Sequence, residues 1–139
     1  MGRYVILHAD GGSRGNPGPA GIGVEVLDDS GKVLHQISKR IGRATNNEAE
    51  YQALIAGLHA ALKLGAQEVM VRMDSELVVR HIQGRYRVRS AGLLPLYQQA
   101  MALKGRFARF HIEHVPRLSN SRADALVNQA LDESDRRPP

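Results

Sequence analysis

The chain has 139 residues, no cysteine, 42% hydrophobic residues and 19 Lys and Arg against 14 Asp and Glu, a net charge of +5. This composition predicts one globular domain, and the missing cysteines exclude a disulfide framework, thiolate metal ligands and a cysteine nucleophile. No apolar run approaches the ~20 residues of a membrane-spanning helix and no signal-peptide pattern opens the chain, so a cytoplasmic protein is expected. The basic balance suits a polyanionic partner, although ordinary surface charge explains it equally well.

The first part of the chain predicts an antiparallel meander of three strands. Apolar residues over 3–10 indicate the first strand, which a loop rich in glycine and proline follows. Residues 21–27 and 32–41 alternate along two further strands, and the turn over 28–31 has hairpin composition.

The second part of the chain predicts helices and strands in alternation. The expected elements are a helix over 45–64, a strand over 67–73, a helix opening at Asp74 and Ser75, a basic connector over 84–90, a helix over 93–103, a strand over 106–115 with Ala108, Phe110 and Ile112 facing the core, a loop over 116–121 and a helix over 122–131. A helix after the meander makes the fourth strand parallel to the first. We therefore expect an α/β fold over residues 1–131, with a five-stranded mixed sheet flanked by helices, and a frayed tail over 132–139.

Two aspartates follow apolar strands. Asp10 ends the first predicted strand and Asp74 ends the fourth. If these strands are parallel neighbours, both carboxylates emerge at the same end of the sheet, where α/β folds place their sites. The alternatives are structural, because Asp10 is also suited to starting a turn and Asp74 to capping a helix.

Two further acids lie on helices and edge their apolar stripes. Glu50 precedes Tyr51 in the helix over 45–64, and Asp124 shares a helix side with Val127 and Leu131. Glu48 stands three residues after a threonine, which is the pattern of a capping box, so Glu50 is the preferred site residue.

Four acids at one place would repel one another unless cations neutralise them. Each acid alone is better explained by a structural role, but all four fall at strand ends or on inward helix edges. Such a cluster implies a divalent cation, and oxygen ligands favour magnesium or manganese over zinc.

The residues also carry a family resemblance over nearly the whole chain. The matching blocks are Asp10-Gly11-Gly12-Ser13 with Asn16-Pro17-Gly18, Thr45-Asn46-Asn47-Glu48-Ala49-Glu50, Met73-Asp74-Ser75, and His114-Val115-Pro116-Arg117 with Asn120 and Ala123-Asp124-Ala125-Leu126. In this order and spacing they resemble the type 1 ribonucleases H, in the form that lacks a long basic protrusion after the second helix.

The resemblance implies an endonuclease that hydrolyses the RNA strand of RNA–DNA hybrids and leaves 5′-phosphate and 3′-hydroxyl ends. It implies two Mg²⁺ ions, with Mn²⁺ as a substitute, held by the acids matching the family's metal ligands: Asp10, Glu50, Asp74 and Asp124. The residues implied in substrate binding are Gly11, Gly12, Asn16, Thr45, Asn46 and Asn47. Double-stranded RNA is a further candidate partner, because it too carries the 2′-hydroxyl that marks RNA.

Two features depart from the family pattern. The basic connector over 84–90 is short, which predicts weaker and more salt-sensitive hybrid binding, or is simply a solvated loop. His114 has the position of a histidine that assists product release, but its parity with Phe110 and Ile112 is equally typical of a half-buried strand residue. Arg117 would then take over the electrostatic part of that role.

Other interpretations stay open at this point. Resolvases and exonucleases share such a sheet with clustered acids, and a hybrid- or RNA-binding module without catalysis is a second class. A ribonuclease domain within a reverse transcriptase is a third. Because Met1 opens the first strand and a tail follows the last helix, we expect a free-standing protein, and by default a monomer.

Overall fold

The computed structural model describes residues 3–135 of the chain, and its helices and strands follow the predicted order. Within that range the elements are β1 (Arg3–Ser13), β2 (Gly18–Asp28), β3 (Val33–Ala44), α1 (Asn46–Lys63), β4 (Ala66–Met73), α2 (Glu76–Ile82), α3 (Leu94–Lys104), β5 (Arg109–His114), the 3₁₀ turn η1 (Arg117–Asn120) and α4 (Ser121–Asp135). No helix among these residues has the length and apolar character needed to cross a membrane.

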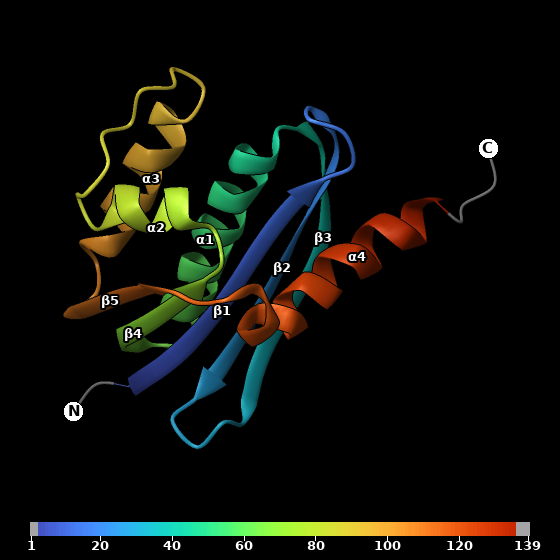
Figure 1. Cartoon of the computed structure of the whole chain (residues 1–139). Helices are drawn as coiled ribbons and strands as arrows, with labels where there is room; N and C mark the ends of the chain where they lie inside the picture. Colours follow the sequence, from blue (N-terminus) through green and yellow to red (C-terminus); the bar gives the residue numbers. More distant parts are fainter. Residues whose placement is uncertain (1–2, 136–139) are drawn as a thin grey trace.

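One mixed sheet of five strands forms the centre of the molecule. Its order is β3-β2-β1-β4-β5, in which β1 and β2, and β2 and β3, pair antiparallel, whereas β1 and β4, and β4 and β5, pair parallel (Figure 1). The predicted meander and the parallel fourth strand are therefore confirmed. The parallel pairing brings the carboxyl ends of β1 and β4 to one end of the sheet, as expected of a fold in which a helix connects the strands.

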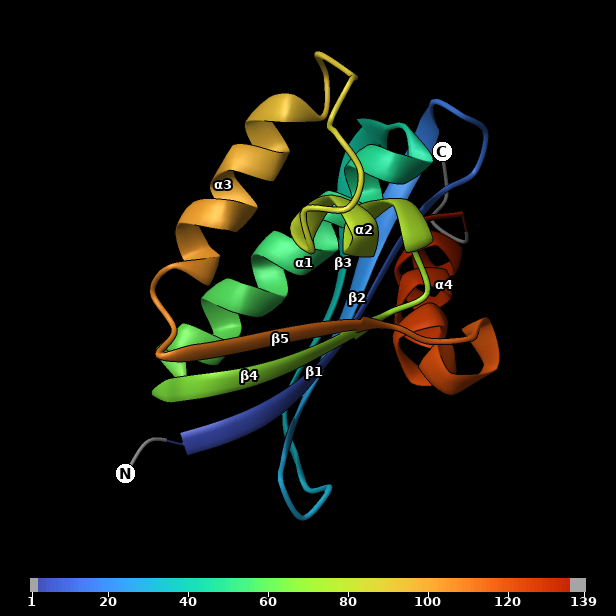
Figure 2. The ribbon, with the colours of Figure 1, turned by 60° about the vertical axis from the view of Figure 1, so that its left-hand side comes forward.

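Helices cover both faces of the sheet. Helices α1, α2 and α3 lie on one face, and α4 lies on the other (Figure 2). Val5, Leu7 and Ala9 of β1 point into the main core on the α1 face, where they are fully buried. On the opposite face Gly23 lets α4 approach β2 closely, because a Cβ at this residue would lie 2.1 Å from the carbonyl oxygen of Ala123.

Several predicted boundaries were wrong. β1 does not stop at Asp10, because its antiparallel pairing with β2 continues to the pair Ser13 and Ala20. α4 continues through the first part of the predicted tail to Asp135, and an ion pair between Arg14 and Asp132 holds this part of the helix to the β1–β2 loop. The rest of that tail, 136–139, lies outside the described residues.

The last strand is also shorter than predicted. β5 begins at Arg109, and Ala108 is exposed just before it rather than facing the core. Phe110 and Ile112 do pack against the main core as expected, beside Val69 and Val71 of β4. β5 is an edge strand, and four of its six residues are exposed.

Candidate active site

Asp10 and Asp74 meet at the end of the parallel pair β1 and β4. The register of this pair ends with His8 opposite Arg72, and two residues further along each strand stand Asp10 and Asp74. Because side chains alternate along a strand, this step of two keeps both carboxylates on one side of the sheet. Asp10 is only 7% exposed although β1 continues past it.

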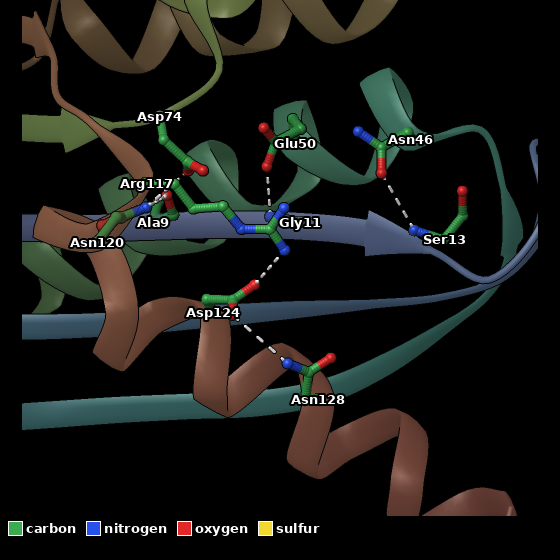
Figure 3. A network of polar contacts seen from close by, with 10 residues as sticks. All are labelled: Ala9, Gly11, Ser13, Asn46, Glu50, Asp74, Arg117, Asn120, Asp124 and Asn128. Atoms are coloured by element: carbon green, nitrogen blue, oxygen red, sulfur yellow. Dashed lines mark hydrogen bonds and ion pairs between the residues drawn. The ribbon is translucent and has the colours of Figure 1, made fainter.

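Helix α1 brings Glu50 to the same place. Its N-terminus is fixed by the capping box between Thr45 and Glu48, so the predicted structural role of Glu48 is confirmed. The backbone of α1 touches β1 at Gly11, where a Cβ would lie 2.2 Å from the carbonyl carbon and oxygen of Ala49. This contact lets the Gly11 N–H donate a hydrogen bond of 2.5 Å to Oε1 of Glu50 (Figure 3).

Three of the predicted acids form one cluster. Oxygen atoms of Asp10, Glu50 and Asp74 all lie within 4.8 Å of one another. The structural alternatives for these acids do not describe what is seen: Ser75, not Asp74, caps α2, and Asp10 lies within a strand rather than at a turn. The three carboxylates come from three separate elements, so only the folded chain brings them together.

Asp124 lies beside the cluster, on α4. It sits in the first turn of α4 and lines the same cleft, which has a volume of about 460 Å³. Its Oδ1 accepts a hydrogen bond of 3.3 Å from Arg117 and its Oδ2 one of 3.5 Å from Asn128 (Figure 3). Its membership of the metal-ligand set stays a prediction.

Two acids of the cluster, Asp10 and Glu50, have pKa values raised above those of ordinary carboxylates. Burial raises the pKa of Asp10 to about 7, and the neighbouring Asp74 and Asp124 act in the same direction. Burial and the charge of Asp10 raise the pKa of Glu50 well above its usual range. Carboxylates that resist ionisation because they lie buried beside one another fit a bound divalent cation, whose charge would stabilise all of them.

Stability of the metal-free protein is expected to fall as the pH rises from about 4 to about 7. The pKa of Asp10 is near 3.8 in the unfolded chain and about 7 in the folded protein, so between these pH values the folded state binds more protons than the unfolded state. Above pH 7 the folded protein carries the whole free-energy cost of an ionised, buried Asp10. The shift corresponds to roughly 4 kcal/mol for this group. Chemical denaturation in EDTA at pH 5 and pH 8 gives the free energy of unfolding of wild type and of Asp10→Asn, and the difference between the two proteins at each pH measures the effect of this group. A difference that does not change with pH would contradict the prediction.

Four of the predicted substrate-binding residues line the cleft. Gly11, Gly12, Asn46 and Asn47 lie around the acids, and a neighbouring pocket of about 350 Å³ contains Asn16, Thr45 and again Asn47. Oδ1 of Asn46 accepts from the Ser13 N–H at 3.3 Å, and Oδ1 of Asn16 accepts from the Asn46 N–H at 3.0 Å. These bonds join the β1–β2 loop to the start of α1 and form one polar rim beside the acids.

His114 and Arg117 differ sharply in position. His114 is exposed at the end of β5, so the expectation of a half-buried residue was wrong. Arg117 lines the cleft, and the charges of Asp124, Asp10 and Asp74 raise the pKa of its guanidinium. The positive charge of Arg117 is thus attracted to the acids.

Asn120 was not predicted as a site residue, although it belongs to the sequence blocks that carry the resemblance. It ends η1, is 1% exposed and donates a hydrogen bond of 3.0 Å to Oδ1 of Asp74. Its spacing of four residues before Asp124 placed it near the site, but only the packing of η1 against β1 shows which carboxylate it contacts.

The sheet order and the acid cluster at its end define a ribonuclease H-like protein. The sequence model of the family described as reverse transcriptase-like matches residues 8–130. Ribonuclease HI of Halobacterium salinarum is 43% identical over 133 residues, which are 96% of this chain and 67% of that protein. The chain belongs to the ribonuclease HI family.

Longer relatives and solved structures agree with this assignment. A bifunctional protein of Mycobacterium tuberculosis is 55% identical over 92% of this chain, which spans only 35% of that relative. The solved N-terminal RNase H domain of the M. tuberculosis protein, fused to maltose-binding protein, has 54% identity and a TM-score of 0.90 over 93% of this chain and 99% of the other. LC11-RNase H1, solved with an RNA/DNA hybrid, has 45% identity and a TM-score of 0.89 over 94% and 98%.

Proposed function

We propose that the protein hydrolyses the RNA strand of RNA–DNA hybrids and leaves 5′-phosphate and 3′-hydroxyl ends. The observation that carries the proposal is the cluster of carboxylate oxygens from Asp10, Glu50 and Asp74 within 4.8 Å of one another in a polar cleft. The relatives named ribonuclease HI and the related enzyme solved with an RNA/DNA hybrid support the same substrate.

The acids would hold two Mg²⁺ ions, with Mn²⁺ as a substitute. Asp10, Glu50 and Asp74 offer the first ligands, and Asp124 is the proposed fourth, once it exchanges its contact with Arg117 for a cation. Bound cations of this kind lower the pKa of a water molecule and stabilise the negative charge on the leaving oxygen. The chain holds the three carboxylates together from β1, α1 and the connection after β4, and a bound cation would offset the repulsion between them.

The polar rim beside the acids would bind the hybrid. Asn46 and Asn47 stand at the positive end of α1, and their amides suit the minor groove, while Asn16 and Thr45 line the adjacent pocket. The 2′-hydroxyl identifies the RNA strand, so Glu50 and the backbone at Gly11 and Gly12 are the proposed readers. Double-stranded RNA carries the same hydroxyl and is a second proposed substrate. A cytoplasmic monomer stays part of the proposal.

The basic connector between α2 and α3 bears on affinity. It contains no helix, and Arg85, Arg87 and Arg89 are exposed in it. Phosphate contacts made by such a short segment are few, so the proposed binding is weak, and its affinity falls only gradually with salt because few counterions are released.

Cleavage of end-labelled RNA–DNA hybrid tests the proposed function. We expect cleavage of the RNA strand with Mg²⁺, none in EDTA, and none of single-stranded RNA or double-stranded DNA under the same conditions. Analysis of the product ends shows whether cleavage leaves the proposed 5′-phosphate and 3′-hydroxyl ends. A protein that binds the hybrid in Mg²⁺ but leaves it intact would instead be a binding module.

Arg117→Ala is expected to lower the turnover rate on the hybrid by about tenfold, because its charge faces the acids and would meet the phosphate of the substrate or product. His114→Ala is the matched comparison, and a reduction of less than about threefold is expected because this exposed side chain does not line the cleft. Single-turnover and steady-state rates measured on both variants separate bond cleavage from product release. A larger loss for His114→Ala would reverse the assignment.

A further inference from the structure

The side-chain amide of Asn120 has all of its polar atoms occupied inside the protein. Its Nδ2 donates to the carbonyl oxygen of Ala9 at 2.9 Å and to Oδ1 of Asp74 at 3.0 Å (Figure 3). Its Oδ1 lies 3.2 Å from Nδ1 of His8. Because Oδ1 is an acceptor, Nδ1 of His8 must carry the hydrogen in this pair. The three contacts connect β1, η1 and the connection after β4.

His8 reaches this amide from outside the catalytic cleft. It is half-buried on β1 and lines a separate pocket of about 230 Å³ together with Glu25 and Arg122, whereas the acids line the cleft on the other side of Asn120. His8 therefore lies where substrate in the cleft does not touch it.

Asp74 is the acid of the cluster that most needs an external support. Asp10 is held by the strand pairing of β1, and Glu50 accepts the hydrogen bond from the Gly11 N–H. Asp74 stands after the end of β4 and before the N-cap of α2, where no ladder fixes it. Its bond to Asn120 is therefore the contact that sets where its carboxylate points.

We propose that His8 is a positioning residue: its Nδ1–H holds the amide of Asn120, which in turn holds Asp74 toward Asp10 and Glu50. Without a donor at residue 8, Oδ1 of Asn120 becomes a buried acceptor with no partner, and the amide turns to recover one at the expense of its bond to Asp74. The effect on catalysis rests on the proposed function, but the effect on cation binding does not.

Direct titration of Mn²⁺, followed by electron paramagnetic resonance of the free ion, tests the proposal without any turnover. His8→Phe removes the donor and keeps a ring, and we expect a 3- to 10-fold weaker Mn²⁺ affinity. Asn120→Ala removes the contact to Asp74 itself and is expected to weaken affinity about 10- to 100-fold. His8→Gln retains an N–H donor and should bind Mn²⁺ within twofold of wild type.

The matched control is His111→Phe, the same exchange on β5, where the exposed ring contacts the half-buried Glu68 at 3.0 Å. Thermal unfolding in EDTA confirms that each variant is folded, and kinetics on the hybrid should show a lower kcat for His8→Phe with KM within twofold. Wild-type affinity in His8→Phe, or an equal loss in His8→Gln, would overturn the proposal. If wild type binds Mn²⁺ without cleaving hybrid, the proposed function fails while the Mn²⁺ titrations still decide the role of His8.

Discussion

Replacing Asp10 with asparagine is expected to reduce cleavage of the RNA–DNA hybrid by at least about 1,000-fold, which is about 4 kcal/mol of barrier. Asp10 is a buried member of the acid cluster, so its loss removes one of the charges that would hold a cation. The same substitution should raise the unfolding temperature of the metal-free protein at pH 8, because it removes an ionised group whose pKa is raised to about 7 by burial. Lost activity together with gained stability separates a site residue from a structural one.

Asp29→Asn is the control for this exchange, because Asp29 is exposed in the turn after β2 and does not line the cleft that holds the acids. It should cleave hybrid at the wild-type rate. Cleavage assays on purified proteins at equal concentration, with added Mg²⁺, provide the measurement. Wild-type cleavage by Asp10→Asn would contradict the proposed two-metal chemistry.

Replacing Gly11 with alanine is expected to destabilise the protein by about 3 kcal/mol or more and to weaken cation binding as well. The new Cβ would lie 2.2 Å from the backbone of Ala49 and 2.5 Å from the backbone nitrogen of Glu50, so α1 must move away from β1. Any such movement also lengthens the hydrogen bond from the Gly11 N–H to Glu50. Denaturant unfolding and Mg²⁺ calorimetry measure the two effects.

Gly12→Ala is the matched control for stability. Its φ is not positive, and the nearest atom to a Cβ there is Cγ1 of Val127 at 3.6 Å, an ordinary contact distance. A change in unfolding free energy below about 1 kcal/mol is expected. Equal destabilisation by both substitutions would mean that the close approach of α1 is not the reason why residue 11 must be glycine.

The order of the elements followed from patterns that act over short distances. Alternation over 21–27 and 32–41 and the helical stripe after Thr45 come from side chains sorting to one face of a strand or helix, and the capping box of Thr45 and Glu48 is complete within four residues. The ends of elements were harder to predict. β1 passes Asp10 because β2 offers it a partner, and α4 passes Leu131 into a turn where Asp132 pairs with Arg14 of the β1–β2 loop.

The sequence by itself indicated that Asp10, Glu50, Asp74 and Asp124 follow apolar runs or edge apolar helix faces, and so predicted one polar site. Only the tertiary structure decided how each is held: Glu50 by the N–H of Gly11, Asp74 by Asn120, and Asp124 by Arg117. Local periodicity reports which face a side chain occupies, but a hydrogen bond between residues 39 or 46 positions apart depends on where whole elements pack. Distances of that kind exist only after the sheet and its helices have assembled.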